Sequence, residues 1–135
     1  ADLQDYRGAI ADFNMAIEID PMYAGAYNNR GLAKSNLQDF RGAIADYSLA
    51  IEIDPELVEP YFNRGLSKHH LKDYRGAIAD YTIVAEIQPK FAGAYYNRGL
   101  AQHALGNKEE GCMDLSKGGE LGEAQAYIAI RDLCQ

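Results

Sequence analysis

The chain has 135 residues, of which 47% are hydrophobic, so it can bury the core of one modest domain without metal or disulfide support. Thirteen basic and twenty acidic residues give a net charge of -7, and no cluster of Lys and Arg offsets it, which disfavours nucleic acid as a partner. No run approaches about eighteen apolar residues and no segment resembles an export leader, so no membrane span is expected and the cytoplasm is the default compartment, although a leader that has been cut away would leave the same sequence.

Three similar segments dominate the sequence, and they recur at a constant spacing of 34 residues. They begin at Asp5, Asp39 and Asp73, and read DYRGAIADFNMAIEIDP, DFRGAIADYSLAIEIDP and DYRGAIADYTIVAEIQP. A diverged fourth copy, NKEEGCMDLSKGGELGE, begins on the same schedule at Asn107. A period of this length indicates stacked supersecondary units.

The first predicted element is an amphipathic helix over residues 3–19. Its apolar residues fall at helical intervals and form one stripe. The stripe consists of Tyr6, Ala9, Ile10, Phe13, Ala16 and Ile17. The same pattern predicts equivalent helices in the later copies.

The segments between the copies predict a second kind of helix, of about four turns. Each lacks strand-like alternation, follows a proline and precedes an Asp or Asn start signal. Helices joined by such short connections must lie antiparallel. We call the proline-preceded helix of each pair the first helix and the other the second helix. One pair cannot bury its own stripe, so the pairs must stack, and a uniform rotation between them produces a concave inner wall.

These residues resemble the tetratricopeptide repeat. The resemblance rests on the period of 34 and on aromatic, Gly, Ala and Pro positions that recur with it: Tyr27, Tyr61, Tyr95, Gly31, Gly65, Gly99, Ala43, Ala77, Tyr47, Tyr81, Pro55 and Pro89. It implies an all-α, right-handed superhelical solenoid of about eight helices in a single domain, 1–135. The expected units are the second helix of a truncated repeat (1–21), repeats at 24–57, 58–91 and 92–125, and a capping helix at 123–134.

The end of the third repeat departs from the pattern. Gly111, Gly118 and Gly119 should each weaken the helix by roughly 1 kcal/mol relative to Ala, so we interpret this region as the end of the array. The final helix would then cap it. Two buried thiols are the favoured state of Cys112 and Cys134. A disulfide is the alternative, because an antiparallel capping helix would return Cys134 to the level of residues 108–112.

The helix at 3–19 has no predicted first helix to cover it. We therefore expect residues 1–135 to be part of a longer array, with an open apolar edge that favours homo-association through the N-terminal helix.

The triplet Asn-Arg-Gly recurs at 29–31, 63–65 and 97–99. The glycines are expected where the two helices of a repeat cross closely. Reflection about the intervening turn places Arg30 level with Asp46 and Arg64 level with Asp80, and predicts buried ion pairs in preference to ligand contacts. Asp12 is a second candidate for Arg30, and Asp114 in the weaker helix is the reflected partner of Arg98.

The asparagines of the triplets form a column on the predicted inner wall: Asn29, Asn63 and Asn97. A side-chain amide both donates and accepts, so it can hold a peptide backbone at its C=O and N–H without reading side chains. In the tetratricopeptide repeat family, such a column resembles those that grip extended peptides. The alternative is that these amides only tie first helices to one another or to water.

Apolar and aromatic neighbours are candidate anchors for the same peptide: Leu32, Leu66, Leu100, Phe62 and Tyr96. Some of them could equally be core. His69 and His103 occupy the same repeat position, about 8–10 Å apart, which is too far to share a metal, so we interpret them as lining the groove or as surface residues.

No phosphate-binding loop, nucleophile elbow or paired catalytic carboxylate occurs in the sequence, so we predict no catalytic residue, no metal, no cofactor and no enzyme. Some family members bind acidic chaperone tails through a clamp of Lys, Arg and Asn. Of the matching positions here, Asn28, Leu32, Asn63, Gly93 and Asn97, only Asn63 fits that clamp. The predicted function is a protein-interaction module that binds an extended peptide, preferably apolar or basic, in the groove. The alternative is a scaffolding segment that stacks end to end with an unused groove.

Overall fold

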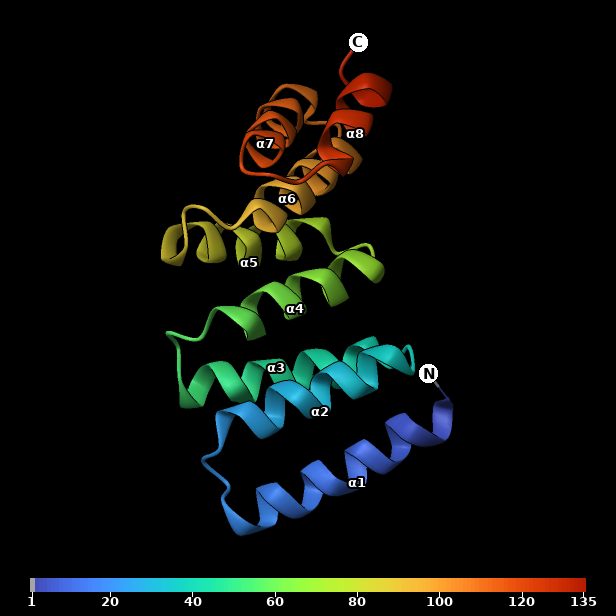
Figure 1. The fold of residues 1–135 in the computed structure, drawn as a ribbon, viewed down its shortest axis with the longest axis vertical. Helices are drawn as coiled ribbons and strands as arrows, with labels where there is room; N and C mark the ends of the chain where they lie inside the picture. Colours follow the sequence, from blue (N-terminus) through green and yellow to red (C-terminus); the bar gives the residue numbers. More distant parts are fainter. Residues whose placement is uncertain (1) are drawn as a thin grey trace.

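The computed structural model describes residues 2–135, which fold into eight α-helices joined by short turns and contain no strand. The helices are α1 Leu3–Ile19, α2 Ala24–Asn36, α3 Phe40–Ile53, α4 Val58–His70, α5 Tyr74–Ile87, α6 Ala92–Ala104, α7 Lys108–Glu120 and α8 Gln125–Leu133. They follow one another along the long axis of the molecule, from α1 at one end to α7 and α8 at the other (Figure 1). The predicted all-α helical solenoid is confirmed. None of the helices described is long and apolar enough to cross a membrane.

The second helices α3 and α5 begin at the aspartates that the sequence marks as start signals. The side chains of Asp39 and Asp73 accept hydrogen bonds from the backbone N–H groups of Gly42 and Gly76, each at 3.0 Å. These bonds satisfy donors that the first turn of a helix leaves free. The turns just before them contain Gln38 and Lys72 with a φ of +64°, a conformation that favours glycine.

A tyrosine from the second helix fills the crossing between the two helices of repeats one and two. Tyr47 and Tyr81 are almost completely buried. A Cβ added to Gly31 would lie 2.6 Å from the Tyr47 ring, and one added to Gly65 would lie 2.7 Å from the Tyr81 ring. The glycines therefore make room for an aromatic ring, whereas the sequence predicted a close approach of the two backbones.

The two backbones do approach closely in the third repeat. A Cβ on Gly99 would lie 2.8 Å from the carbonyl oxygen of Gly111, and a Cβ on Gly111 would lie 2.9 Å from that of Gly99. Gly118 likewise faces the backbone of α6, where its Cβ would lie 3.1 Å from the N atom of Tyr96. Leu115 replaces the core tyrosine and is completely buried. The interpretation of these glycines as mere helix weakening was incomplete, because they permit close packing of α6 and α7.

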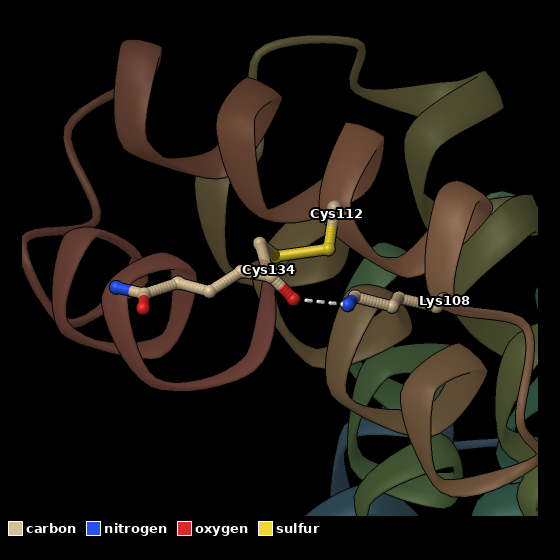
Figure 2. Close-up of a disulfide and its surroundings, with 4 residues drawn as sticks. Lys108, Cys112 and Cys134 are labelled. Atoms are coloured by element: carbon tan, nitrogen blue, oxygen red, sulfur yellow. Dashed lines mark hydrogen bonds between the residues drawn. A yellow bond between two sulfur atoms is a disulfide. The ribbon is translucent and has the colours of Figure 1, made fainter.

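The C-terminal helix α8 folds back on α7, as the sequence predicted for a cap. A disulfide joins Cys112 of α7 to Cys134, just beyond the end of α8, so the favoured expectation of two thiols was wrong and the alternative holds. Figure 2 shows this bond together with a second contact at the same place, in which the Lys108 ammonium donates to the backbone oxygen of Gln135. At the other end of α8, Ala126 is fully buried and the Tyr127 ring lies over Gly119. The cap is thus attached at both of its ends.

Candidate binding surface along the first helices

The first helices α2, α4 and α6 form a continuous row. α2 contacts α4 and α4 contacts α6, whereas no comparable set of contacts joins α1, α3, α5 and α7 to one another within residues 2–135. The first helices therefore lie closer together than the second helices do. A stack of this kind curves toward its closer-spaced row, which makes the row the inner wall. All ten residues predicted to bind a peptide lie on these three helices.

The three asparagines of the predicted column differ in their surroundings. Asn29 is exposed, whereas Asn63 and Asn97 are half-buried. Asn63 Nδ2 donates to Asn28 Oδ1 at 3.2 Å, which ties α4 to α2. Asn97 Nδ2 donates to the carbonyl oxygen of Gly93 in its own helix at 2.8 Å. The tie between first helices that the sequence offered as an alternative is therefore formed at Asn63.

The amide groups of the column retain unused hydrogen-bonding capacity. Each side-chain amide has two N–H donors and one carbonyl acceptor. Asn63 and Asn97 each use one N–H, and their Oδ1 atoms accept no bond from any residue in 2–135. Their different partners follow from the sequence, since Asn28 lies 35 residues before Asn63 while Phe62 lies 35 residues before Asn97.

The apolar candidates divide into exposed and packed side chains. Leu32 is 38% exposed, and Leu66, Leu100 and Tyr96 are half-buried. Phe62 packs between repeats, with its ring 4.9 Å from that of Phe91 and 5.9 Å from that of Tyr81. Phe62 therefore contributes to the core between repeats two and three, and the core interpretation left open by the sequence applies to it.

His69 and His103 each hold a ring nitrogen away from solvent. Their Nδ1 atoms are buried and have no hydrogen-bond partner in the described residues. The His69 ring stands edge-on to Tyr74 at 5.2 Å, and burial, with a smaller contribution from the charge of His70, lowers the pKa of His69. No group of three or more His, Cys, Asp or Glu side chains in residues 2–135 could hold a metal ion.

The arginines of the triplets are occupied by ion pairs, as predicted. Each guanidinium makes a two-bond contact with the aspartate sixteen residues later, at 2.6–2.9 Å: Arg30 with Asp46, Arg64 with Asp80 and Arg98 with Asp114. These bonds raise the pKa of each arginine above its ordinary value, although burial acts in the opposite direction.

A second basic residue completes two of the three aspartate sites. The ammonium groups of Lys34 and Lys68 lie 3.0 Å and 3.2 Å from the carboxylates of Asp46 and Asp80. The third repeat has Gln102 at this position, and its aspartate, Asp114, is less buried than the other two. The cations on the first helices of repeats one and two are therefore neutralised within the fold.

Each arginine also reaches the preceding repeat, which the sequence interpretation missed. The Nη1 atoms of Arg30, Arg64 and Arg98 donate to Asn14, Ser48 and Thr82 at 2.9, 3.1 and 3.2 Å. Asp12, the other candidate partner of Arg30, is not used. The signal was available, because a short polar side chain stands sixteen residues before every arginine. Each arginine thus links two successive second helices through a first helix.

The larger cavities lie in the second half of the molecule, away from the asparagine column. One of about 780 Å³ runs along α7 and includes Tyr95, Met113 and Lys117. Another of about 720 Å³ is lined by residues 87–93, at the connection between α5 and α6. Their linings are mainly apolar side chains or connecting backbone, and they contain no asparagine of the column. We give the column more weight as a candidate site because its polar groups are arranged with the repeat.

Comparison with known families identifies the repeat. The family model described as TPR repeat matches residues 1–38 and 68–106, and the one described as Tetratricopeptide repeat matches residues 24–57. A search of curated proteins found no match. Repeats of this family generally mediate protein–protein interactions and are generally not enzymes.

Solved structures with the same fold include a crystal structure of MamA, with 19% identity over 96% of this chain and 79% of that one and a TM-score of 0.88. The Arabidopsis OM64 TPR domain has 24% identity over 82% and 93% of the two chains, with a TM-score of 0.79. The first TPR domain of Spaghetti (RPAP3), bound to the HSP90 peptide SRMEEVD, has 24% identity over 83% and 90%, with a TM-score of 0.80. These likenesses show the fold, and the matches to the family models, which together cover more than half of the sequence, show that the chain belongs to the tetratricopeptide repeat family.

Proposed function

We propose that the row formed by α2, α4 and α6 binds an extended segment of a partner protein. The observation that carries this proposal is the unused hydrogen-bonding capacity of Asn63 and Asn97, which each keep one N–H and one carbonyl oxygen on a row of adjoining helices. A peptide backbone offers the complementary C=O and N–H at regular intervals. Asn29 extends the same column by one repeat, and Leu32, Leu66 and Leu100 supply apolar contact beside it.

The charges of the row favour an apolar or basic peptide over an acidic one. Lys34 and Lys68 already pair with buried aspartates, so they cannot neutralise a ligand carboxylate without leaving Asp46 and Asp80 less well compensated. Glu59, in the first turn of α4, adds an exposed negative charge. The peptide SRMEEVD that the RPAP3 domain binds is therefore a poor match for this surface.

A displayed library of unstructured peptides, selected against the full chain, tests the proposal. We expect selected peptides to bind through the row, and the double substitution Asn63→Ala and Asn97→Ala to weaken their binding by about thirtyfold, since two hydrogen bonds of about 1 kcal/mol each are lost. Asn107→Ala is the matched control, because this amide lies in the turn before α7 and bonds only Gln102. SRMEEVD serves as the acidic counter-probe and should not bind measurably.

Two outcomes would contradict the proposal. One is a selected peptide that binds the double variant as tightly as the unchanged chain. The other is a library in which no sequence binds at the row, as mapped by chemical-shift changes in α2, α4 and α6. The alternative function, a scaffold that stacks through its end with an unused row, is favoured by the second outcome, and its one supporting observation is the uncovered helix α1.

A further inference from the structure

Helix α1 is equivalent to α3 and α5 in the repeat but lacks their cover. Residues 9, 12, 13 and 16 of α1 correspond to core positions that are almost completely buried in α3 and α5, namely Ala43, Asp46, Tyr47 and Ala50, and Ala77, Asp80, Tyr81 and Val84. In contrast, α1 has no buried residue, Asp12 is exposed, and Ile19 is 84% exposed. One face of α1 therefore has the composition of a packed helix face but remains open.

The other face of α1 is already occupied. Asn14 accepts a hydrogen bond from Arg30 of α2, which is the same contact that Ser48 makes with Arg64 and Thr82 with Arg98. Helix α1 thus stands in the same register as α3 and α5, and only the side that carries Asp12 and Phe13 is uncovered.

The helices that cover α3 and α5 show what this open face fits. Each presents the pattern Arg-Gly-x-x-Lys, in α2 as Arg30, Gly31 and Lys34 and in α4 as Arg64, Gly65 and Lys68. The arginine and the lysine converge on one aspartate carboxylate, at 2.6–2.9 Å and 3.0–3.2 Å, and the glycine makes room for the aromatic ring beside it. Asp12 and Phe13 repeat the aspartate and the ring.

We propose that the open face of α1 is a docking surface for a basic amphipathic helix from outside residues 1–135, with the pattern Arg-Gly-x-x-Lys facing Asp12 and Phe13. Charge complementarity at Asp12 selects the two cations, and the ring of Phe13 requires the glycine between them. Apolar side chains around this pattern would cover Met15 and Ile19. This interaction is separate from the peptide-binding row, which lies on α2, α4 and α6.

A second copy of the same chain does not supply this helix. The Arg-Gly-x-x-Lys segments of α2 and α4 are already engaged in their own repeats. The terminal helix α8 has no glycine or lysine, and its Arg131 is bonded to the adjacent Asp132. Antiparallel pairing of two α1 helices would bring their Asp12 carboxylates together, because Asp12 lies near the middle of Leu3–Ile19.

A graft tests the proposal on the full chain. Residues 55–68 are added directly before residue 1, which places the grafted Arg64 sixteen residues before Asp12, the spacing found in every Arg–Asp pair of the fold. We expect the melting temperature to rise by at least about 4 °C. A matched graft with Glu at the positions of Arg64 and Lys68 should give a clearly smaller rise.

The substitution Asp12→Lys supplies the charge reversal. It should remove most of the gain from the basic graft and restore it for the acidic graft, because opposite charges again face each other. Equal gains for both grafts, in both versions of the chain, would overturn the proposal, since they would show that any added helix stabilises α1. Sedimentation equilibrium of the ungrafted chain should show a monomer, and self-association that is lost when α1 is covered by the graft would instead identify a second copy as the occupant.

Discussion

The arginines of the Asn-Arg-Gly triplets each join three helices. Arg64 lies on α4, forms two bonds with Asp80 of α5 and donates a third to Ser48 of α3. Its guanidinium also lies 5.9 Å from the centre of the Tyr61 ring. All five N–H groups of an arginine point in fixed directions, so one side chain can satisfy partners on both sides of a helix, which an apolar residue at this position cannot do.

The two members of this ion pair differ in what their removal would leave behind. The Asp80 side chain is 2% exposed, whereas that of Arg64 is 18% exposed and can reach water. We expect Arg64→Met to lower the free energy of unfolding by about 3 kcal/mol, because it leaves a buried carboxylate with only Lys68 to compensate it. Asp80→Asn should cost less. Urea unfolding followed by circular dichroism measures both, and a larger loss for Asp80→Asn would refute this assignment.

Left-handed backbone at two non-glycine residues stores a small amount of strain. Lys72 has a φ of +64°, and the equivalent residue of the next repeat is Gly106, with a φ of +86°. We expect Lys72→Gly to raise the free energy of unfolding by about 0.5–1 kcal/mol, because glycine adopts this conformation without steric penalty. Gly106→Ala is the reciprocal control and should lower stability. Thermal unfolding of both variants checks the opposite signs.

At the scale of single elements, α7 and α8 depart most from the repeat. Glycines at 99, 111 and 118 let α6 and α7 approach to backbone contact, and Leu115 takes the place of a core tyrosine. The short helix α8 then closes the stack. A helix of nine residues is marginal in water by itself, and Ala126 is its one fully buried residue, so its attachment depends strongly on the disulfide at its far end.

Reduction of that disulfide should loosen α8 selectively. The bond closes a segment between cysteines 22 positions apart, and a loop of that length corresponds to about 3 kcal/mol of stabilisation. We expect the backbone amides of α8 to exchange with deuterium faster after reduction, or in Cys112→Ser with Cys134→Ser, while those of α3–α5 keep their protection. Hydrogen exchange read by mass spectrometry measures the difference, and uniform protection in both states would show that packing alone holds the cap.

For the molecule as a whole, the period of 34 residues predicts the architecture because every repeat solves the same packing problem. The number of helices, their antiparallel pairs and the Arg–Asp partners follow from reflection about short turns. Features specific to one place in the array were less accessible from the sequence. The packing of Phe62 into the core and the turn of Asn97 toward its own helix depend on which side chain lies 35 residues earlier, and close packing at Gly111 depends on two glycines meeting across helices.

The bonds of each arginine to residues sixteen positions before and after it have a consequence for how such a chain changes length. The two offsets add up to 32 and recur every 34 residues, so loss or duplication of a whole unit by recombination between its near-identical stretches would rejoin matched donors and acceptors at the seam. An insertion of any other size would strand a guanidinium or a carboxylate. Variation in the number of units is therefore tolerated by the chemistry of the interior, while variation within a unit is restricted to its turns and outer surface.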